Sequence, residues 1–415
     1  MPRIRIPALL RDGNFTRYLI GSSVSTLGSG MSTVALAFAV LGMGGVTDLG
    51  IVLLAREVPT IIFVLLGGVF ADRIRRRTIL VSTDVVKALA QGLTALLFFS
   101  GTADLLTVAV LQVIFGVAIA FSGPATTGLV REVATDETLQ EANALLQLSR
   151  SVLNIAGPAV GALIVAAGSP ALALAIDAAS FLVSATFTLS LRLPGLVRVA
   201  AASILVDLRG GWREFVERRW AVAMVISFGL FQLTYFPALN VLGPSVAQTQ
   251  LGGPATWGLI LAIESVGAVV GGVVSLRLKV ARPLVACQLF VVPSGLLLIG
   301  LAVPLPVAVL LVLSAAVGFG FAAGNTYWQT ALQQNVPEHA LSRISSFDWL
   351  GSIAFNPLGY ALIGPLATAI GTSQALVACG VINVFAAVGV VFVPSVRRIR
   401  MTATGAPAAP EMSPP

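Results

Sequence analysis

Apolar residues run along this chain in long stretches, separated by Gly, Pro and charged residues. A helix that crosses the hydrocarbon core of a bilayer needs about 20 such residues. The pattern therefore predicts an all-α membrane protein with twelve transmembrane helices, at residues 18–41, 49–70, 79–100, 105–121, 145–167, 172–193, 221–242, 255–274, 284–301, 307–323, 350–370 and 374–393.

The second half of the chain repeats features of the first half. The segment GIVLL at 50–54 resembles GLILA at 258–262, Glu57 falls opposite Glu264, and GGV at 67–69 falls opposite GGV at 271–273. A parallel repeat of this kind relates two bundles about an axis along the membrane normal. We therefore expect two six-helix bundles, at residues 1–193 and 220–393, joined by a connection at 194–219 and followed by a tail at 394–415. The tail is rich in Pro and Ala, which predicts partial disorder.

The basic residues predict the orientation, because Lys and Arg accumulate in short cytoplasmic loops. Of the 25 Lys and Arg residues, 23 lie at the N-terminus, at the C-terminus or in alternate connections. The opposite loops, such as 42–48, 101–104 and 371–373, hold none. Both termini, the connection at 194–219 and the tail are therefore predicted to be cytoplasmic, in a multi-pass protein of the cell membrane.

Composition excludes several other functions. Hydrophobic residues make up 57% of the chain and charged residues 10%, against about 25% charged residues in a soluble protein. The chain has two cysteines, both in apolar runs, and one histidine, His339, which argues against a metal site and His-based catalysis. Neither of its two lysines follows a glycine, as a P-loop requires. We predict no enzyme activity, no cofactor, no metal and no nucleic-acid partner.

The loop after the second span carries a motif. Residues 68–77 read GVFADRIRRR, which resembles the G-x-x-x-D-R-x-G-R-[RK] loop of major facilitator superfamily transporters. Residues 272–279, GVVSLRLK, resemble its degenerate second copy. The resemblance implies a conformational-switch loop formed by Gly68, Asp72, Arg73, Arg76 and Arg77. Alternatively, the arginines are only a positive-inside anchor, which needs no Asp72.

Two further segments add to this resemblance. The fifth span contains GPAVG at 157–161, which resembles part of the antiporter signature and implies a kink and sliding surface at Gly157, Pro158 and Gly161. The alternative is a close-packed kinked helix without meaning for export. The segment DLRGGW at 207–212 resembles the amphipathic cytoplasmic linker of drug- and siderophore-exporter branches.

Ionisable residues inside spans are costly and are candidates for function. By position, Arg56, Glu57 and Glu264 lie near mid-depth. By resemblance, spans two and eight flank the central cavity, which implies that the two acids face one another across the transport path. Burial would then enable proton exchange near neutral pH, and Glu57, Glu264 and Arg56 are the candidates for proton coupling. The alternative is a structural ion pair with Arg56.

Four other charged residues in or near the spans are predicted to have structural or peripheral positions. Asp84 and Lys87 are three residues apart and can pair on one helix face. Asp348 lies near the cytoplasmic end of its span, and Asp177 belongs to a span that is peripheral by resemblance.

The resemblance also implies which spans line the cavity, namely one, four, seven and ten. Candidate substrate-cavity residues on these spans are Gln112, Gln232, Tyr235, Asn240, Asn325 and Trp328. Such a lining is mostly apolar and suits an amphipathic solute better than a sugar or phosphate. Gln112 stands where many proton-coupled members carry Arg, which excludes proton coupling through that position.

The leading hypothesis is a monomeric, proton-coupled exporter of a small amphipathic organic molecule, of the drug, antibiotic or siderophore type. Its partners would be the solute, protons and the bilayer, and it would work by alternating access of the two bundles. The alternative on the same fold is an uptake symporter or facilitator. A receptor or a membrane enzyme is the hypothesis from a different class.

Overall fold

The computed structural model describes residues 9, 12–135, 138–193, 215–275, 277–278, 280–303, 305–337, 344–345, 348 and 351–400. Regular structure in these ranges is helical throughout. Contacts divide the chain into two units, Met1–Ala200 with Gly243–Ala262 and Ala201–Leu242 with Ile263–Pro415. Residues 194–214 of the predicted connection and residues 401–415 of the predicted tail lie outside the described residues.

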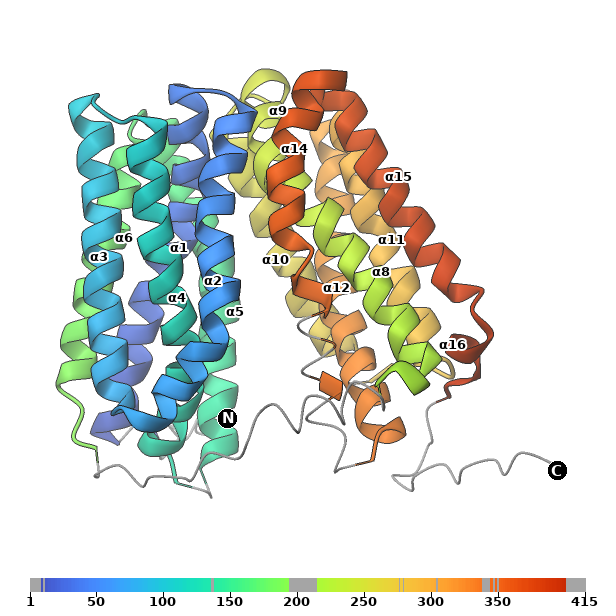
Figure 1. Cartoon of the computed structure of the whole chain (residues 1–415), viewed down its shortest axis with the longest axis horizontal. Helices are drawn as coiled ribbons and strands as arrows, with labels where there is room; N and C mark the ends of the chain where they lie inside the picture. Colours follow the sequence, from blue (N-terminus) through green and yellow to red (C-terminus); the bar gives the residue numbers. More distant parts are fainter. Residues whose placement is uncertain are drawn as a thin grey trace, which may run out of the picture. The chain divides into compact units, whose positions relative to one another are not determined.

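The first unit contains the six long helices α1 to α6, which run alongside one another in Figure 1. Helix α1 packs against α5 and α6, α2 packs against α4, and α3 packs against α4 and α6. The same unit includes the short helix α9 and the first part of α10, which spans Pro254–Ser275. The bounds are α1 Gly13–Met43, α2 Val46–Arg73, α3 Arg76–Ser100, α4 Leu105–Val133, α5 Leu139–Ala166, α6 Pro170–Leu189 and α9 Gly243–Gln250.

Local signals set several helix ends in this unit. The Asp12 carboxylate accepts hydrogen bonds from the first backbone N–H groups of α1, and Asp104 caps α4 in the same way, accepting from the Thr107 backbone N–H at 3.0 Å. Hydrogen bonds from the Thr107 side chain and backbone lower the pKa of Asp104. Gly101 ends α3 with a φ of 70°, a left-handed conformation that glycine adopts readily.

The second unit contains the other long helices. Helix α11 packs against α12 and α15, and α8 packs against α14 and α15. The bounds are α8 Arg219–Pro237, η2 Ala238–Leu242, α11 Pro283–Ala302, α12 Val307–Asn335, α14 Asn356–Ile370, α15 Thr372–Val391 and α16 Pro394–Arg398, with the rest of α10. The span predicted at 221–242 is interrupted by the π-helical turn η2, directly after Pro237, which has no N–H to donate.

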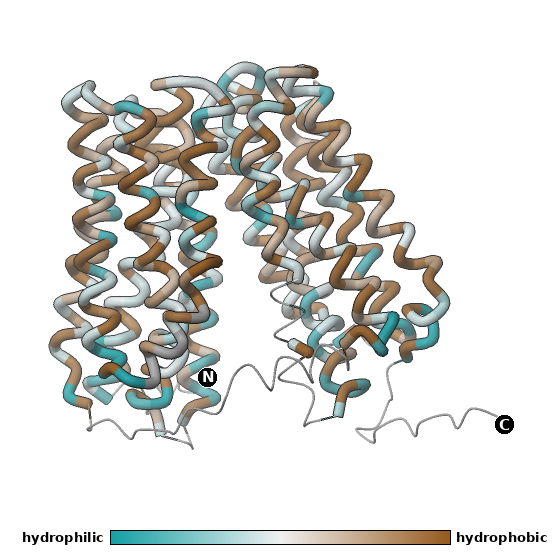
Figure 2. Tube along the Cα trace, in the orientation of Figure 1, coloured by the Kyte–Doolittle hydropathy of each residue, from teal (hydrophilic) through white to brown (hydrophobic). Residues whose placement is uncertain are grey.

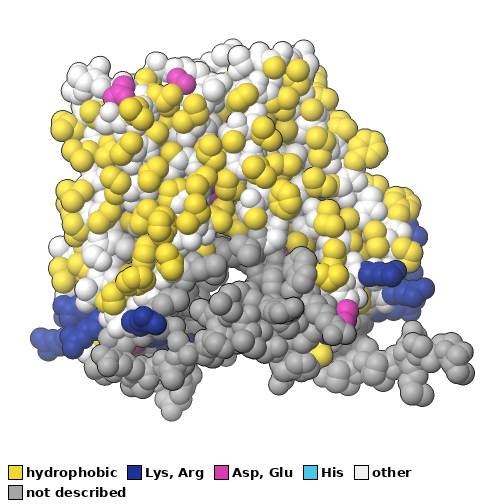
Figure 3. All heavy atoms as spheres, viewed as in Figure 1, with side chains coloured by type: hydrophobic (Ala, Val, Ile, Leu, Met, Phe, Trp, Pro, Cys, Tyr) yellow, Lys and Arg dark blue, Asp and Glu magenta, His cyan; other side chains and the backbone are white. Residues whose placement is uncertain are grey.

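Helix lengths and surface fit a bilayer. Eleven helices among the described residues are long and apolar enough to cross a membrane, and α2, with 28 residues, also has the length to do so. Apolar residues predominate along the helices (Figure 2). On α3, Leu89, Leu93 and Leu96 are 61%, 50% and 60% exposed, a stripe that suits contact with lipid. Figure 3 shows apolar side chains over the visible flank of the first unit, with Lys and Arg gathered at one end.

Some helices extend beyond the predicted spans. Helix α4 runs to Val133 rather than ending at residue 121, and Pro124 lies inside it. The sequence pattern placed the boundary at this Gly-Pro punctuation. Membrane helices tolerate such residues because neighbouring groups satisfy the freed backbone, so the punctuation does not end the helix here.

Glycines bring two pairs of helices into backbone contact, one pair in each unit. A Cβ at Gly67 of α2 would meet the Ala120 carbonyl of α4, and a Cβ at Gly271 of α10 would meet the Phe319 carbonyl of α12. Gly67 and Gly271 are equivalent in the sequence repeat. Small residues permit such approaches in membranes, where packing contacts replace the hydrophobic force between helices. The two halves therefore share the same contact as well as the same residues.

The α10–α12 contact yields a stability prediction. A Cβ at Gly318 of α12 would collide with the backbone carbonyl of Glu264, which cannot move aside as a side chain could. We expect Gly318→Val to lower the free energy of unfolding by about 1–3 kcal/mol or more, the usual cost of overpacking. Thermal unfolding of the purified protein, monitored by size-exclusion chromatography, measures this loss of stability.

Gly272→Val is the matched control, because nothing lies within 4 Å of a Cβ built at Gly272. Equal melting temperatures for Gly318→Val and the wild-type protein would show that the two helices do not depend on this contact.

Candidate transport site

The first unit buries a set of polar side chains around Asp177 of α6, which is fully buried. Gln91 of α3 donates from Nε2 to Asp177 Oδ2 at 3.0 Å, and the Ser180 hydroxyl donates to Oδ1 at 3.4 Å. The Ser32 hydroxyl of α1, which donates to the Ser29 carbonyl at 3.1 Å, lies next to the same carboxylate. These contacts bring three helices together, so Asp177 has the structural position that the sequence predicted.

Asp84 and Lys87 form the predicted pair on α3. Lys87 Nζ lies 2.7 Å from Asp84 Oδ1, with side-chain exposures of 11% and 8%. The ammonium also lies 4.5 Å from the centre of the Phe181 ring on α6, a cation–π arrangement. The predicted ion pair is confirmed, and the contact of Lys87 with Phe181 connects α3 to α6.

Arg56 and Glu57 are adjacent on α2. The Arg56 guanidinium lies 4.4 Å from the centre of the Phe115 ring on α4, so Arg56 reaches a different helix. Glu57 is half-buried in the first unit. Gln112 of α4 is fully buried, and neither atom of its amide has a hydrogen-bond partner within the part of the chain that the structure describes.

The loop after α2 holds its arginines in different ways. Arg76 pairs with Glu132 of α4 at 2.9 Å and donates to the Gly128 carbonyl at 3.2 Å. Arg77 donates to the carbonyls of Leu189 and, at 3.0 Å, of Leu191. Arg77 therefore binds backbone oxygens at the C-terminus of α6, where the helix dipole favours a positive charge.

The other residues of this motif have fewer described contacts. Arg73 ends α2 and is exposed. Gly68 and Asp72 lie within the helix α2, and the side chain of Asp72 is outside the described residues. The role of the five-residue motif as a conformational switch remains a proposal.

Gly157, Pro158 and Gly161 lie on the face of α5 that packs against α1. A Cβ at Gly157 would lie 2.8 Å from the Gly30 Cα, and one at Gly161 would lie 2.6 Å from the Met31 Cα. Both distances are too short for a real Cβ, so the segment is a close helix contact within the first unit. This contact agrees with the close-packed alternative and leaves an antiporter role as a proposal.

In the second unit, Glu264 of α10 neighbours the hydroxyl of Tyr235 on α8. Tyr235 is fully buried, and its ring stacks on Phe231 with 4.9 Å between ring centres. Glu264 Oε2 and the Tyr235 hydroxyl are buried, and in the described part of the chain neither has a partner that meets hydrogen-bond geometry. The two groups therefore form an incompletely satisfied polar pair inside an aromatic cluster.

A cavity of about 410 Å³ is lined by residues of the second unit. Phe231 and Phe321, which both contact the Tyr235 ring, are also part of its wall. The described residues that line it are Phe228, Phe231, Gln232, Phe236, Cys287, Val291, Gly320, Phe321, Gly324, Asn325, Trp328, Gln329, Asp348, Ser352 and Ile353.

Three of the six predicted cavity residues, Gln232, Asn325 and Trp328, line this cavity. Tyr235 is not among the described lining residues, but its ring contacts Phe231 and Phe321, which are. Asn240 instead donates from Nδ2 to the Tyr360 hydroxyl at 2.9 Å. Gln112 belongs to the first unit.

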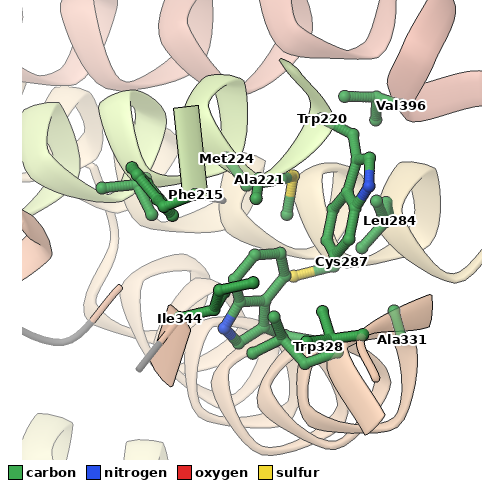
Figure 4. Packing of buried hydrophobic residues seen from close by; sticks show 13 residues of the cluster. Phe215, Trp220, Ala221, Met224, Leu284, Cys287, Trp328, Ala331, Ile344 and Val396 are labelled. Atoms are coloured by element: carbon green, nitrogen blue, oxygen red, sulfur yellow. The ribbon is translucent and has the colours of Figure 1, made fainter. Parts of the chain in front are cut away.

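Sequence reasoning missed the position of Asp348. The indole Nε1 of Trp328 donates to Asp348 Oδ2 at 2.9 Å, and Asp348 lines the cavity. Figure 4 shows Trp328 next to Cys287 in a cluster of buried hydrophobic residues, and both also line the cavity. The available signal was an acidic residue beside an apolar span, but nothing in the sequence spacing links it to Trp328.

A comparison with known proteins shows the class. Residues 18–356 match the family model of the Major Facilitator Superfamily, and the chain belongs to this superfamily. It is a multi-pass membrane transporter and not an enzyme.

The chain is similar to "Multidrug efflux pump Tap" of Mycolicibacterium fortuitum, with 27% identity over 94% of this chain and 98% of that one. It also resembles "Enterobactin exporter EntS" of Shigella boydii, with 27% identity over 81% of each chain. Among solved structures, the nucleoside transporter NupG (D323A mutant) aligns with a TM-score of 0.77 and 12% identity, covering 91% of this chain and all of NupG. A bacterial homologue of the iron transporter ferroportin aligns with a TM-score of 0.72 and 14% identity, covering 93% of this chain and 100% of that one. At these low identities, the two structures support the fold and nothing further about function.

The polar set around Asp177 yields a second prediction. Gln91→Leu removes the donor to Asp177 Oδ2 and leaves a buried acceptor unpaired, which typically costs about 1–3 kcal/mol. We expect a lower melting temperature, measured on the purified protein. Gln147→Leu is the same change at an exposed position on α5 and should leave stability nearly unchanged. Equal stabilities for the two variants would contradict the structural role of this set.

Proposed function

We propose that this transporter exports a small amphipathic organic molecule, of the drug, antibiotic or siderophore type, in exchange for protons across the cell membrane. Two relatives that align over most of their length are named as exporters. The observation that carries the proposal is a buried acid beside an aromatic cavity. Phe231 and Phe321 line the cavity and contact Tyr235, which in turn neighbours Glu264. A solute in the cavity would therefore be linked to a proton on Glu264 through two layers of side chains.

This proximity suggests how the two movements are coupled. A buried carboxylate such as Glu264 can alternate between a protonated and a charged form, and Tyr235 can donate to the charged form. Solute in the cavity would press on Phe231 and Phe321, and through them on Tyr235. We propose that this contact makes release of the proton and binding of the solute depend on each other, as exchange requires. Arg56 and Glu57 of the first unit remain proposed partners in coupling.

The first test measures the direction and the driving force of transport. In inverted membrane vesicles with an acidic lumen, protons leave the lumen and should drive the solute into it. A neutral and a cationic fluorescent amphipathic dye are tested side by side. We expect at least one of them to accumulate in the lumen until nigericin collapses the pH gradient. An uptake symporter would instead remove the dye from the lumen.

The Glu264→Gln variant tests the coupling residue. It keeps the shape of the side chain and removes its exchangeable proton, so we expect accumulation to fall to the level of vesicles without the transporter. Glu217→Gln is the matched control, because Glu217 is exposed. Export by Glu264→Gln that still responds to the pH gradient would overturn the assignment of this residue.

The charge pattern gives a separate prediction about orientation. We propose that both termini are cytoplasmic, because the basic residues lie at both ends and in alternate connections. Green fluorescent protein fused to the C-terminus should fluoresce, whereas alkaline phosphatase fused there should be inactive. The reverse result would contradict the predicted orientation.

A further inference from the structure

The cavity of the second unit has one formal charge among its described lining residues, the carboxylate of Asp348. Neither Lys nor Arg is among these residues. The volume of about 410 Å³ falls within the range of pockets that hold drug-sized molecules. Helices α8, α11 and α12 supply most of the wall, and Asp348 comes from the segment before α14.

The Asp348 carboxylate is held in a defined orientation. Trp328 donates to Oδ2 from its indole nitrogen, at 2.9 Å, and this nitrogen can only donate. The Trp328 side chain is itself 3% exposed. Its ring makes edge contacts with Phe228 and Trp220, with 5.3 Å and 5.9 Å between ring centres. The packed indole therefore fixes the acceptor at the edge of the cavity.

Aromatic rings form much of the remaining wall. Phe231 makes edge contacts with Phe236 and Phe321, at 5.4 Å and 5.2 Å between ring centres, and all three line the cavity. The faces of aromatic rings attract cations, and desolvation strengthens that attraction. The Asp348 carboxylate would repel an anion, and the aromatic wall offers few hydrogen-bonding groups to a sugar. A cavity that combines a carboxylate with aromatic rings suits an organic cation.

We propose that this cavity binds an organic cation, with Asp348 as its counter-ion, Trp328 as the residue that positions Asp348, and the phenylalanine rings as its apolar walls. The proposal names the substrate class for the proposed exporter and rests on that function for its biological meaning. The side-chain amides of Gln232, Asn325 and Gln329 on the same wall can bind polar substituents of the cation.

Binding without transport provides the test. The purified full-length protein in detergent is equilibrated with tetraphenylphosphonium or with tetraphenylborate, which have the same shape and opposite charges. We expect saturable binding of the phosphonium and none of the borate at the same concentrations. Equal binding of the two ions by the wild-type protein would overturn the proposal, whatever the variants do.

Variants then locate the charge. Asp348→Asn removes it while the amide oxygen can still accept from Trp328, and we expect phosphonium affinity to fall at least about tenfold, because the cation loses its partner in a desolvated site. Asp348→Glu keeps the charge and should retain more affinity than Asp348→Asn. Asp104→Asn is the matched control, because Asp104 is an exposed helix cap and Asn caps equally well.

Trp328→Phe separates positioning from charge. It keeps a ring and removes the donor to Asp348, so we expect an intermediate loss of affinity and a smaller preference for phosphonium over borate. Wild-type affinity in Asp348→Asn would overturn the proposal. The binding assay uses no gradient, so its outcome is independent of transport. Intact phosphonium binding without export in vesicles would contradict the proposed function alone. Export of a neutral dye without phosphonium binding would contradict this inference alone.

Discussion

Close backbone contact between helices is the constraint on which both units depend. Lipid tails are as apolar as the helices, so burial of apolar surface cannot hold the helices together, and packing has to do so. Glycines supply that packing at repeat-equivalent positions, Gly67 on α2 against α4 and Gly271 on α10 against α12. The same contacts position the charged groups. Arg56 lies where α2 meets α4, over Phe115, and the backbone of Glu264 lies against Gly318.

The two units use their buried polar groups differently. In the first unit, Asp177 has donors on neighbouring helices and Lys87 has both an acid and a ring, so these groups cross-link the bundle. In the second unit, Glu264 and Tyr235 are incompletely satisfied beside a cavity. Buried groups left unsatisfied carry a cost in stability, and such a cost persists where function needs the group. The first unit also buries an unsatisfied amide, that of Gln112, but an amide cannot exchange a proton as the Glu264 carboxyl can. The ionisable character of Glu264 therefore favours the second unit as the place where solute and proton meet.

The sequence predicted the features that depend on local pattern. The spans follow from the long apolar stretches, and the pairing of Asp84 with Lys87 follows from helical spacing. The repeat pointed to Gly67 and Gly271, whose backbone contacts the structure then revealed. The Asp348–Trp328 bond could not be predicted, because no sequence spacing shows that Asp348, which precedes α14, lies against Trp328 of α12. Likewise, Asn240 lies on a span that was predicted to line the cavity, and only the fold shows that its side chain instead bonds Tyr360.

The central claim is that solute leaves in exchange for protons, and the exchange itself can be observed. Proteoliposomes are loaded with ethidium and a pH-sensitive fluorophore, clamped at zero membrane potential, and diluted into dye-free buffer at the same pH. The account predicts that the lumen acidifies as the dye leaves, since each exported molecule brings protons inward, and that liposomes without the transporter show neither change. Loss of the dye through the transporter with no change in lumenal pH would contradict the account.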